Sequence, residues 1–176
     1  SCGGTERDAS IEIRNDRPAV LAHPRARRRA IRQRTRDMNE PTDTQVAAID
    51  RMVRLFYERG LADAVLGPIF FESIHDWEPH IAVVRDFWTD VIHRTTRYRG
   101  NAYAPHMKLD FGAEAFDHWL ACFESAATDC LAPEESATAI RVARHMAQSF
   151  KVGLFPFSAP DGTPSRKPVA KPRTGT

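Results

Sequence analysis

The sequence predicts an all-α domain, and two observations support this. Four stretches carry apolar side chains at the i, i+3, i+4 spacing of one helical face, and Gly- or Pro-containing breaks separate them. No stretch alternates polar and apolar residues for long enough to indicate a sheet. The 42% apolar and 27% charged residues of this 176-residue chain are typical of a single globular domain, which excludes wholesale disorder and fibrous repeats.

Charge divides the chain into three parts. Residues 1–39 contain ten arginines against five acidic residues, and residues 158–176 carry a net charge of +3. Residues 40–157 between them carry a net charge of −6. We therefore expect a folded acidic domain at 40–157 with a basic extension on each side.

The N-terminal extension contains the run RARRRAIRQRTR at residues 25–36. Such a run can bind nucleic acid or another anionic surface by releasing counterions. It has no aromatic residues for base stacking, so we favour a solvated, disordered extension over residues 1–39. The tail at 158–176 is rich in Pro, Ser, Thr and Gly, and we expect it to be disordered as well.

The first helix is predicted over residues 43–59, where Thr42 or Asp43 can act as the N-cap. Gly67 and Pro68 follow, and because Pro cannot continue a regular helix we expect a short turn-like element leading to residues 70–71.

The second helix is predicted over residues 76–95, the most hydrophobic segment of the chain. The loop TRYRGNAYAP at residues 96–105 ends it, because Gly100, Asn101 and Pro105 favour turns. His106 comes directly after this loop.

The third helix is predicted to begin near Ala113 and the fourth at Pro133, which suits the first turn of a helix. Glu134 and Glu135 complement the positive end of the helix dipole there. The fourth helix is expected to end before Pro156.

The chain has no run of apolar residues long enough to span a membrane, and SCGGTERDAS at its start lacks the apolar core of a signal peptide. Three scattered cysteines do not form a disulfide framework. We therefore expect a cytoplasmic protein that makes no membrane contact. His118 and Cys122 have the i, i+4 spacing of two metal ligands, but a structural zinc needs four.

His80 and His106 are the histidines best placed for chemistry. Trp77, Ile81 and Val84 share the helical face of His80 and direct its imidazole toward the interior. The two imidazoles can face each other across an apolar slot formed by Phe56, Phe87, Trp88, Phe116 and Phe123, with polar tips from Tyr57 and Trp119. The alternative is that these aromatic residues only fill the core.

Seven ordered pieces of the chain carry a family resemblance: FY at 56–57, LGPIF at 66–70, W-x-x-H at 77–80, FW at 87–88, YRGN at 98–101, HMKL at 106–109 and F-x-x-W at 116–119. In this order and at these separations, the chain resembles the truncated haemoglobins, most closely group III. The resemblance covers about residues 46–155. The basic head and the PRTGT end are not part of the family's pattern.

The resemblance implies a two-over-two helical globin that binds haem b. His106 matches the proximal histidine that coordinates the iron, and Tyr57, His80 and Trp119 match the distal polar positions. The five aromatic residues of the slot would form the haem pocket. Arg97, Arg99 or Lys108 can pair with the haem propionates, an expectation based on their nearness to His106 in the sequence.

The leading functional hypothesis is a haem protein that binds dioxygen, carbon monoxide or nitric oxide at ferrous iron. A rigid set of hydrogen-bond donors suits slow release and redox chemistry better than oxygen transport. The first alternative is a nitric oxide dioxygenase or peroxidase-like enzyme. It would need a separate reductase, because the chain has no Gly-rich nucleotide motif. The second is a helical nucleic-acid or partner-binding module that lacks haem and uses residues 25–36.

Overall fold

The computed structural model describes Arg27 and residues 40–167. The chain separates into two units, residues 1–37 and residues 38–176. Apart from Arg27, the N-terminal extension and its basic run at 25–36 lie outside the described residues, as do residues 168–176. Our expectations for these segments stay predictions.

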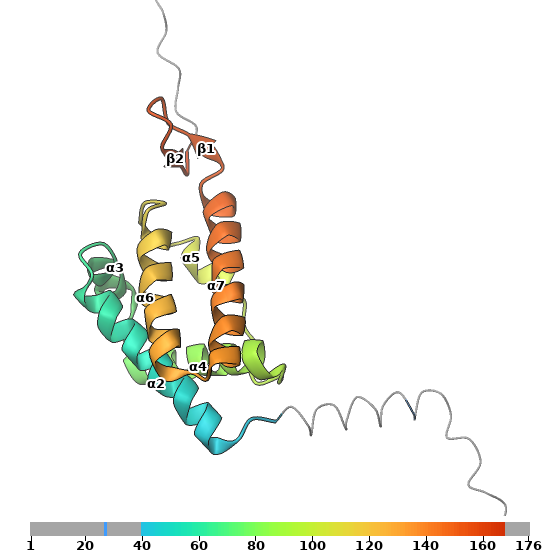
Figure 1. The fold of residues 1–176 in the computed structure, drawn as a ribbon. Coiled ribbons are helices and arrows are strands. Elements are labelled where there is room, and N and C mark those ends of the chain that lie inside the picture. The colour runs from blue at the N-terminus through green and yellow to red at the C-terminus, as the bar shows by residue number, and fades with distance from the viewer. Residues whose placement is uncertain (1–26, 28–39, 168–176) are drawn as a thin grey trace, which may run out of the picture. The chain divides into compact units, whose positions relative to one another are not determined.

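The described part of the second unit is mainly helical (Figure 1). Its elements are α2 (Asp43–Ala62), α3 (Leu66–Ser73), α4 (Trp77–His93), α5 (Tyr103–His106), α6 (Ala115–Cys130), α7 (Pro133–Leu154), β1 (Phe157–Ser158) and β2 (Pro164–Ser165). The four long helices correspond to the four that the apolar spacing predicted. The all-α prediction is confirmed.

The four long helices pack as two pairs. Helix α2 packs on α4 and on α6, and α7 packs on α6 and on α4. Figure 1 shows α6 and α7 side by side. This is the two-over-two arrangement that the family resemblance implied.

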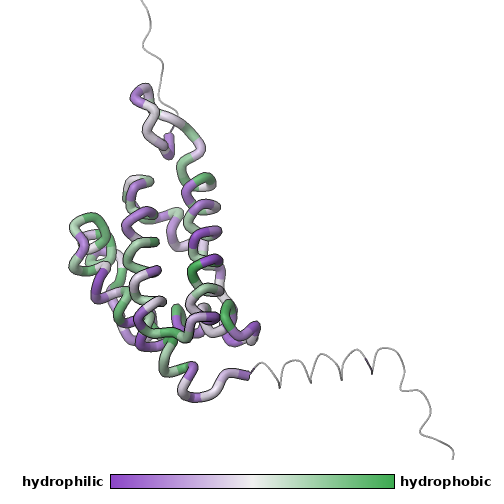
Figure 2. The backbone as a smooth tube through the Cα atoms, in the orientation of Figure 1, coloured by the Kyte–Doolittle hydropathy of each residue, from purple (hydrophilic) through white to green (hydrophobic). Residues whose placement is uncertain are grey.

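The helices are amphipathic, and their apolar faces form the core. Figure 2 shows hydrophobic and hydrophilic residues in turn along the long helices. Small residues line the contact between α6 and α7, where Ala126, Ala127, Ala139 and Ala143 are fully buried and let the two backbones approach closely. None of the described helices is long and apolar enough to cross a membrane.

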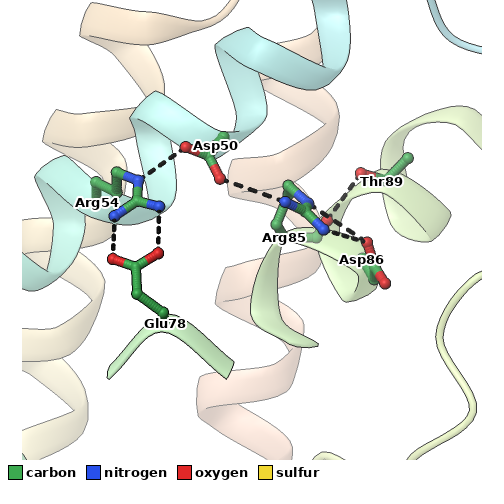
Figure 3. A network of polar contacts seen from close by, with 6 residues as sticks. All are labelled: Asp50, Arg54, Glu78, Arg85, Asp86 and Thr89. Atoms are coloured by element: carbon green, nitrogen blue, oxygen red, sulfur yellow. Dashed lines mark hydrogen bonds and ion pairs between the residues drawn. The ribbon is translucent and has the colours of Figure 1, made fainter. Parts of the chain in front are cut away.

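Helices α2 and α4 are also joined by a polar network on their outer side (Figure 3). Arg54 donates to Asp50 at 2.8 Å and makes two parallel bonds to Glu78, each of 2.8 Å. Arg85 lies 3.6 Å from Asp50 and its carbonyl accepts from the buried Thr89 hydroxyl. The Arg54 and Arg85 side chains are 46% and 32% exposed, so solvent screens these ion pairs and each adds little to stability.

The segment at Gly67 and Pro68 differs from our expectation of a turn-like element, because it forms helix α3. Pro68 lies in the first turn of α3, where a backbone N–H has no partner within the helix. Asp63 satisfies the start of α3 by accepting from the backbone N–H groups of Val65 at 2.8 Å and Leu66 at 3.0 Å. Pro68 is therefore accommodated in the first turn of α3, which begins at Leu66, and does not interrupt the helix.

The start of the predicted tail also differs from expectation. Residues 157–158 pair with residues 164–165 in a two-stranded antiparallel hairpin. Its turn has Pro160 at the second position and Gly162 at φ +84°, and the Gly162 N–H donates to the Ala159 carbonyl at 2.9 Å. Asp161 accepts from the backbone N–H of Thr163 at 3.0 Å. This turn chemistry gives residues 158–165 a regular structure.

Candidate functional site

A cavity of about 360 Å³ lies among the helices of the described domain. This volume falls within the ~300 to 1,000 Å³ that is usual for small-molecule sites. Its wall is mostly apolar and comprises Phe56, Tyr57, Leu66, Ile69, Phe70, Ser73, Ile74, His80, Val83, Val84, Phe87, Trp88, Tyr98, Ala102, Pro105, His106, Leu109, Phe111, Ala115, Phe116, Trp119, Met146, Ala147 and Phe150. The cavity suits a mainly apolar ligand that is oriented by a few polar groups.

His106 is the last residue of α5 and points one ring nitrogen at its own helix. Its Nδ1 lies 2.8 Å from the carbonyl oxygen of Ala102. Because a carbonyl can only accept, Nδ1 carries the proton. Burial lowers the pKa of His106 below its ordinary value, so the ring is neutral near pH 7 and its Nε2 has a free lone pair.

Local contacts fix the position of this ring. Asn101 Oδ1 accepts from the backbone N–H groups of Tyr103 at 3.0 Å and Ala104 at 3.3 Å, which anchors the start of α5. The Phe150 ring of α7 lies 5.3 Å from the His106 ring, and Tyr103 packs edge-on against Phe150. The imidazole is therefore held by its own helix and by α7.

Tyr57 of α2 and His80 of α4 form a polar pair in the same cavity. The Tyr57 hydroxyl lies 2.6 Å from His80 Nε2. Burial raises the pKa of the Tyr57 phenol well above its ordinary value. The pKa of His80 is lowered, first by burial and second by the charge that His106 would carry. Both members of the pair are therefore uncharged near pH 7.

Trp119 of α6 also lines the cavity, and its indole ring is held by stacking. It lies parallel to Phe123 at 5.3 Å with an interplanar angle of 3°, and Phe123 stacks on Trp88 at 4.3 Å. Phe123 is 1% exposed and is absent from the cavity wall. We expected Phe123 to form part of the pocket wall. Instead, it lies one turn of α6 after Trp119 and stacks on both Trp119 and Trp88, so it supports two residues of the wall without lining the cavity.

The cavity brings together most of the residues that the sequence singled out. The wall contains the two histidines, the tyrosine, the tryptophan Trp119 and four of the five expected aromatic residues, namely His80, His106, Tyr57, Trp119, Phe56, Phe87, Trp88 and Phe116. The basic side chains are not part of the wall. Arg97 pairs with Glu40, and Arg99 and Lys108 are exposed.

Sequence reasoning missed several wall residues. Phe111, Phe150 and Met146 line the cavity near His106, and Phe70 and Tyr98 also contribute. Phe150 and Met146 follow the helical spacing of α7, but spacing alone does not separate a residue facing a cavity from one facing the core. Which part of the apolar stripe faces the cavity depends on how the helices pack.

The metal-ligand spacing of His118 and Cys122 does not lead to a metal site. His118 Nδ1 lies 2.9 Å from Asp63 Oδ2, and this hydrogen bond lowers the pKa of Asp63. No group of three or more potential ligands is found among the residues that the structure describes. The hydrogen bond between His118 and Asp63 joins α6 to the corner between α2 and α3.

Comparison with known proteins shows what this architecture is similar to. No family model matches the chain. Over 115 residues, it is 28% identical to the group 3 truncated haemoglobin of Campylobacter jejuni, an alignment that covers 62% of this chain and 91% of that protein. A crystal structure of group III truncated haemoglobin from Campylobacter jejuni superposes with a TM-score of 0.59 and 27% identity, covering 66% of this chain and 94% of that one. In sequence and in fold, therefore, the chain is similar to a group III truncated haemoglobin, and its fold is an all-α globin fold.

Proposed function

We propose that this chain binds haem b through His106 and holds a diatomic gas, such as dioxygen, carbon monoxide or nitric oxide, beside Tyr57, His80 and Trp119. The observation that carries the proposal is the hydrogen bond from His106 Nδ1 to the Ala102 carbonyl. Metal-ligating histidines usually donate their second ring nitrogen in this way, which fixes the tautomer and frees the other nitrogen to coordinate.

The residues present fit the cofactor. Haem needs one imidazole ligand and an apolar enclosure for its ring. His106 supplies the imidazole at a wall composed largely of Phe, Trp, Ile, Leu and Val side chains. The lowered pKa of His106 supports the same assignment, because only a neutral imidazole can coordinate iron.

The polar residues of the cavity support gas binding. When bound, ferrous haem supplies an open coordination position for a diatomic ligand. The Trp119 indole N–H can donate to a ligand that gains negative charge. The Tyr57 hydroxyl can do so when the Nε2 of His80, 2.6 Å away, carries a proton and donates it to the phenol oxygen, because the single Tyr57 O–H is then available to the ligand. A donor already oriented in this way requires little reorganisation when the gas arrives.

The first test is an absorption spectrum of the full chain expressed with adequate haem. We expect a Soret band that shifts on reduction with dithionite and again on addition of carbon monoxide. A protein that stays colourless after reconstitution with haem contradicts the proposal.

The ligand assignment is tested by His106→Gly, which removes the imidazole and leaves a space for free imidazole. We expect this variant to bind haem weakly and to recover the native spectrum when imidazole is added. His75→Gly is the matched control, because His75 is exposed between α3 and α4 and does not line the cavity. Unchanged haem uptake by His106→Gly would exclude His106 as the ligand.

A further inference from the structure

The C-terminal hairpin carries an arginine that packs against the wall of the cavity. The Arg166 guanidinium lies over the Phe111 ring, 4.4 Å from its centroid, and over the Phe155 ring at 4.8 Å. Phe111 is part of the cavity wall, and Phe155 follows the end of α7. The cation is therefore held beside the cavity by a segment outside the stretch that resembles the family.

This guanidinium is incompletely satisfied. Its Nε and Nη2 atoms are buried and have no hydrogen-bond partner within residues 40–167. The two aromatic rings interact with the face of the cation, but its N–H groups point along its edge and need acceptors. Because a buried donor without an acceptor is costly, the arrangement indicates an acceptor that arrives with a ligand.

The charge of Arg166 selects the kind of acceptor. A guanidinium keeps its positive charge at all physiological pH values, and its planar fork matches a carboxylate. The other basic residues that we considered for this role are less suited: Arg97 already pairs with Glu40, and Arg99 is exposed. A carboxylate carried by the occupant of the cavity would satisfy both the charge and the N–H groups.

We propose that Arg166 binds a propionate carboxylate of haem, so that the C-terminal hairpin forms part of the haem site. The inference rests on the proposed function. It assigns a role to a part of the tail that lies beyond the stretch resembling the family. Its hairpin turn, with Gly162 at φ +84°, is the element that brings Arg166 back to Phe111.

The test measures how fast the full chain releases its cofactor to an excess of a haem-scavenging apoprotein. Each protein is loaded with haem or with haem dimethyl ester, in which both propionates are uncharged. The variants are Arg166→Met, which removes the charge and the N–H groups, and Arg166→Lys, which keeps the charge without the fork. Lys167→Met is the matched control, because Lys167 is the adjacent, exposed cation.

We expect Arg166→Met to release haem about ten- to a hundredfold faster than the unmodified chain, the effect of losing one charge-assisted hydrogen bond. With the dimethyl ester, this difference should largely disappear. Arg166→Lys should give an intermediate rate with haem, and Lys167→Met should leave both rates unchanged.

Three results would overturn the proposal. Equal acceleration with haem and its ester would show that Arg166 only packs on the aromatic rings. An unchanged rate with haem would show that Arg166 makes no contact with the cofactor. These two results contradict this inference alone, because the chain still takes up haem. The third result, a full chain that takes up neither cofactor, would contradict the proposed function itself.

Discussion

The Tyr57 hydroxyl lies 2.6 Å from Nε2 of His80, so a residue of α2 and a residue of α4 form one hydrogen-bonded unit in the cavity. The raised pKa of Tyr57 keeps the phenol protonated, and the lowered pKa of His80 keeps the imidazole neutral. The pair therefore shares a proton without carrying net charge. In the proposed function, Tyr57 can donate to a gas only when His80 donates to the phenol oxygen, so the proposal depends on both members.

Replacing Tyr57 by Phe should speed the release of dioxygen. The lost hydrogen bond to a partly charged acceptor is worth ~1.5 to 3 kcal/mol, which corresponds to about ten- to a hundredfold in the dissociation rate. Stopped-flow displacement of dioxygen by carbon monoxide measures this rate. Tyr98→Phe is the matched control, since it removes one hydroxyl from the same cavity, and equal effects of the two substitutions would contradict the assignment.

Lowering the pH should destabilise the haem-free chain as the buried histidines become protonated. The pKa values of His80, His93 and His106 are lowered from 6.5, so the unfolded state binds protons before the folded state does. The free energy of unfolding should therefore be level above about pH 7.5 and fall as the pH drops below 6.5. Urea unfolding followed by tryptophan fluorescence measures this dependence.

His80→Gln provides the control for the pH dependence, because it removes one of the three histidines and should make the fall between about pH 6.5 and pH 5 less steep. Stability that rises as the pH falls through this range would contradict the prediction.

Replacing Gly67 by Ala should destabilise the corner between α2 and α3. An added Cβ would lie 2.6 Å from the carbonyl oxygen of Leu61, a backbone atom that cannot move without displacing the end of α2. Overpacking of this kind costs ~1 to 3 kcal/mol. Thermal or urea unfolding measures the loss, and Glu72→Ala at an exposed position of the same helix should change stability little.

Replacing Phe123 by Ala should lower stability and also disturb the cavity indirectly. Phe123 is 1% exposed and stacks on both Trp88 and Trp119. Its loss leaves a void that lowers the free energy of unfolding by ~3 to 5 kcal/mol, and it removes the ring against which Trp119 stacks. Urea unfolding measures the first effect and gas release kinetics the second. Phe71→Ala is the control, because Phe71 is 78% exposed. Native stability in Phe123→Ala would show that this ring does not support the tryptophans.

Local signals in the sequence predicted the long helices well. Thr42 makes the N-cap bond that its residue type suggests, accepting from the Gln45 N–H at 3.3 Å, and Pro133 begins α7. The pieces that carry the family resemblance include His80 and His106, and both line the cavity. The helices could be predicted because caps and helical spacing depend on residues within one or two turns of each other, whereas the roles of the two histidines were implied by the family resemblance.

Two local signals were present in the sequence but were misread. The run Pro160, Asp161, Gly162 is typical of a hairpin turn, yet the surrounding Pro- and Ser-rich composition led us to expect a disordered tail. Pro68 is typical of a helix stop when only its residue type is considered. It lies in the first turn of α3, however, and Pro is well tolerated in the first turn of a helix. In both cases the local structure depends on where the Pro or Gly residue lies within the turn or helix, and the overall composition of the segment does not predict it.

The order of the residues alone determined the helices, their amphipathic faces and several of the side chains that line the cavity. Packing decided which of these side chains meet. It stacked Phe123 on Trp119, placed Tyr57 against His80, and placed the Arg166 guanidinium over two neighbouring aromatic rings. The physical reason is that a helical period specifies only the direction in which a side chain points along its own helix, whereas its neighbours come from helices distant in the chain and depend on how all the apolar faces are buried together.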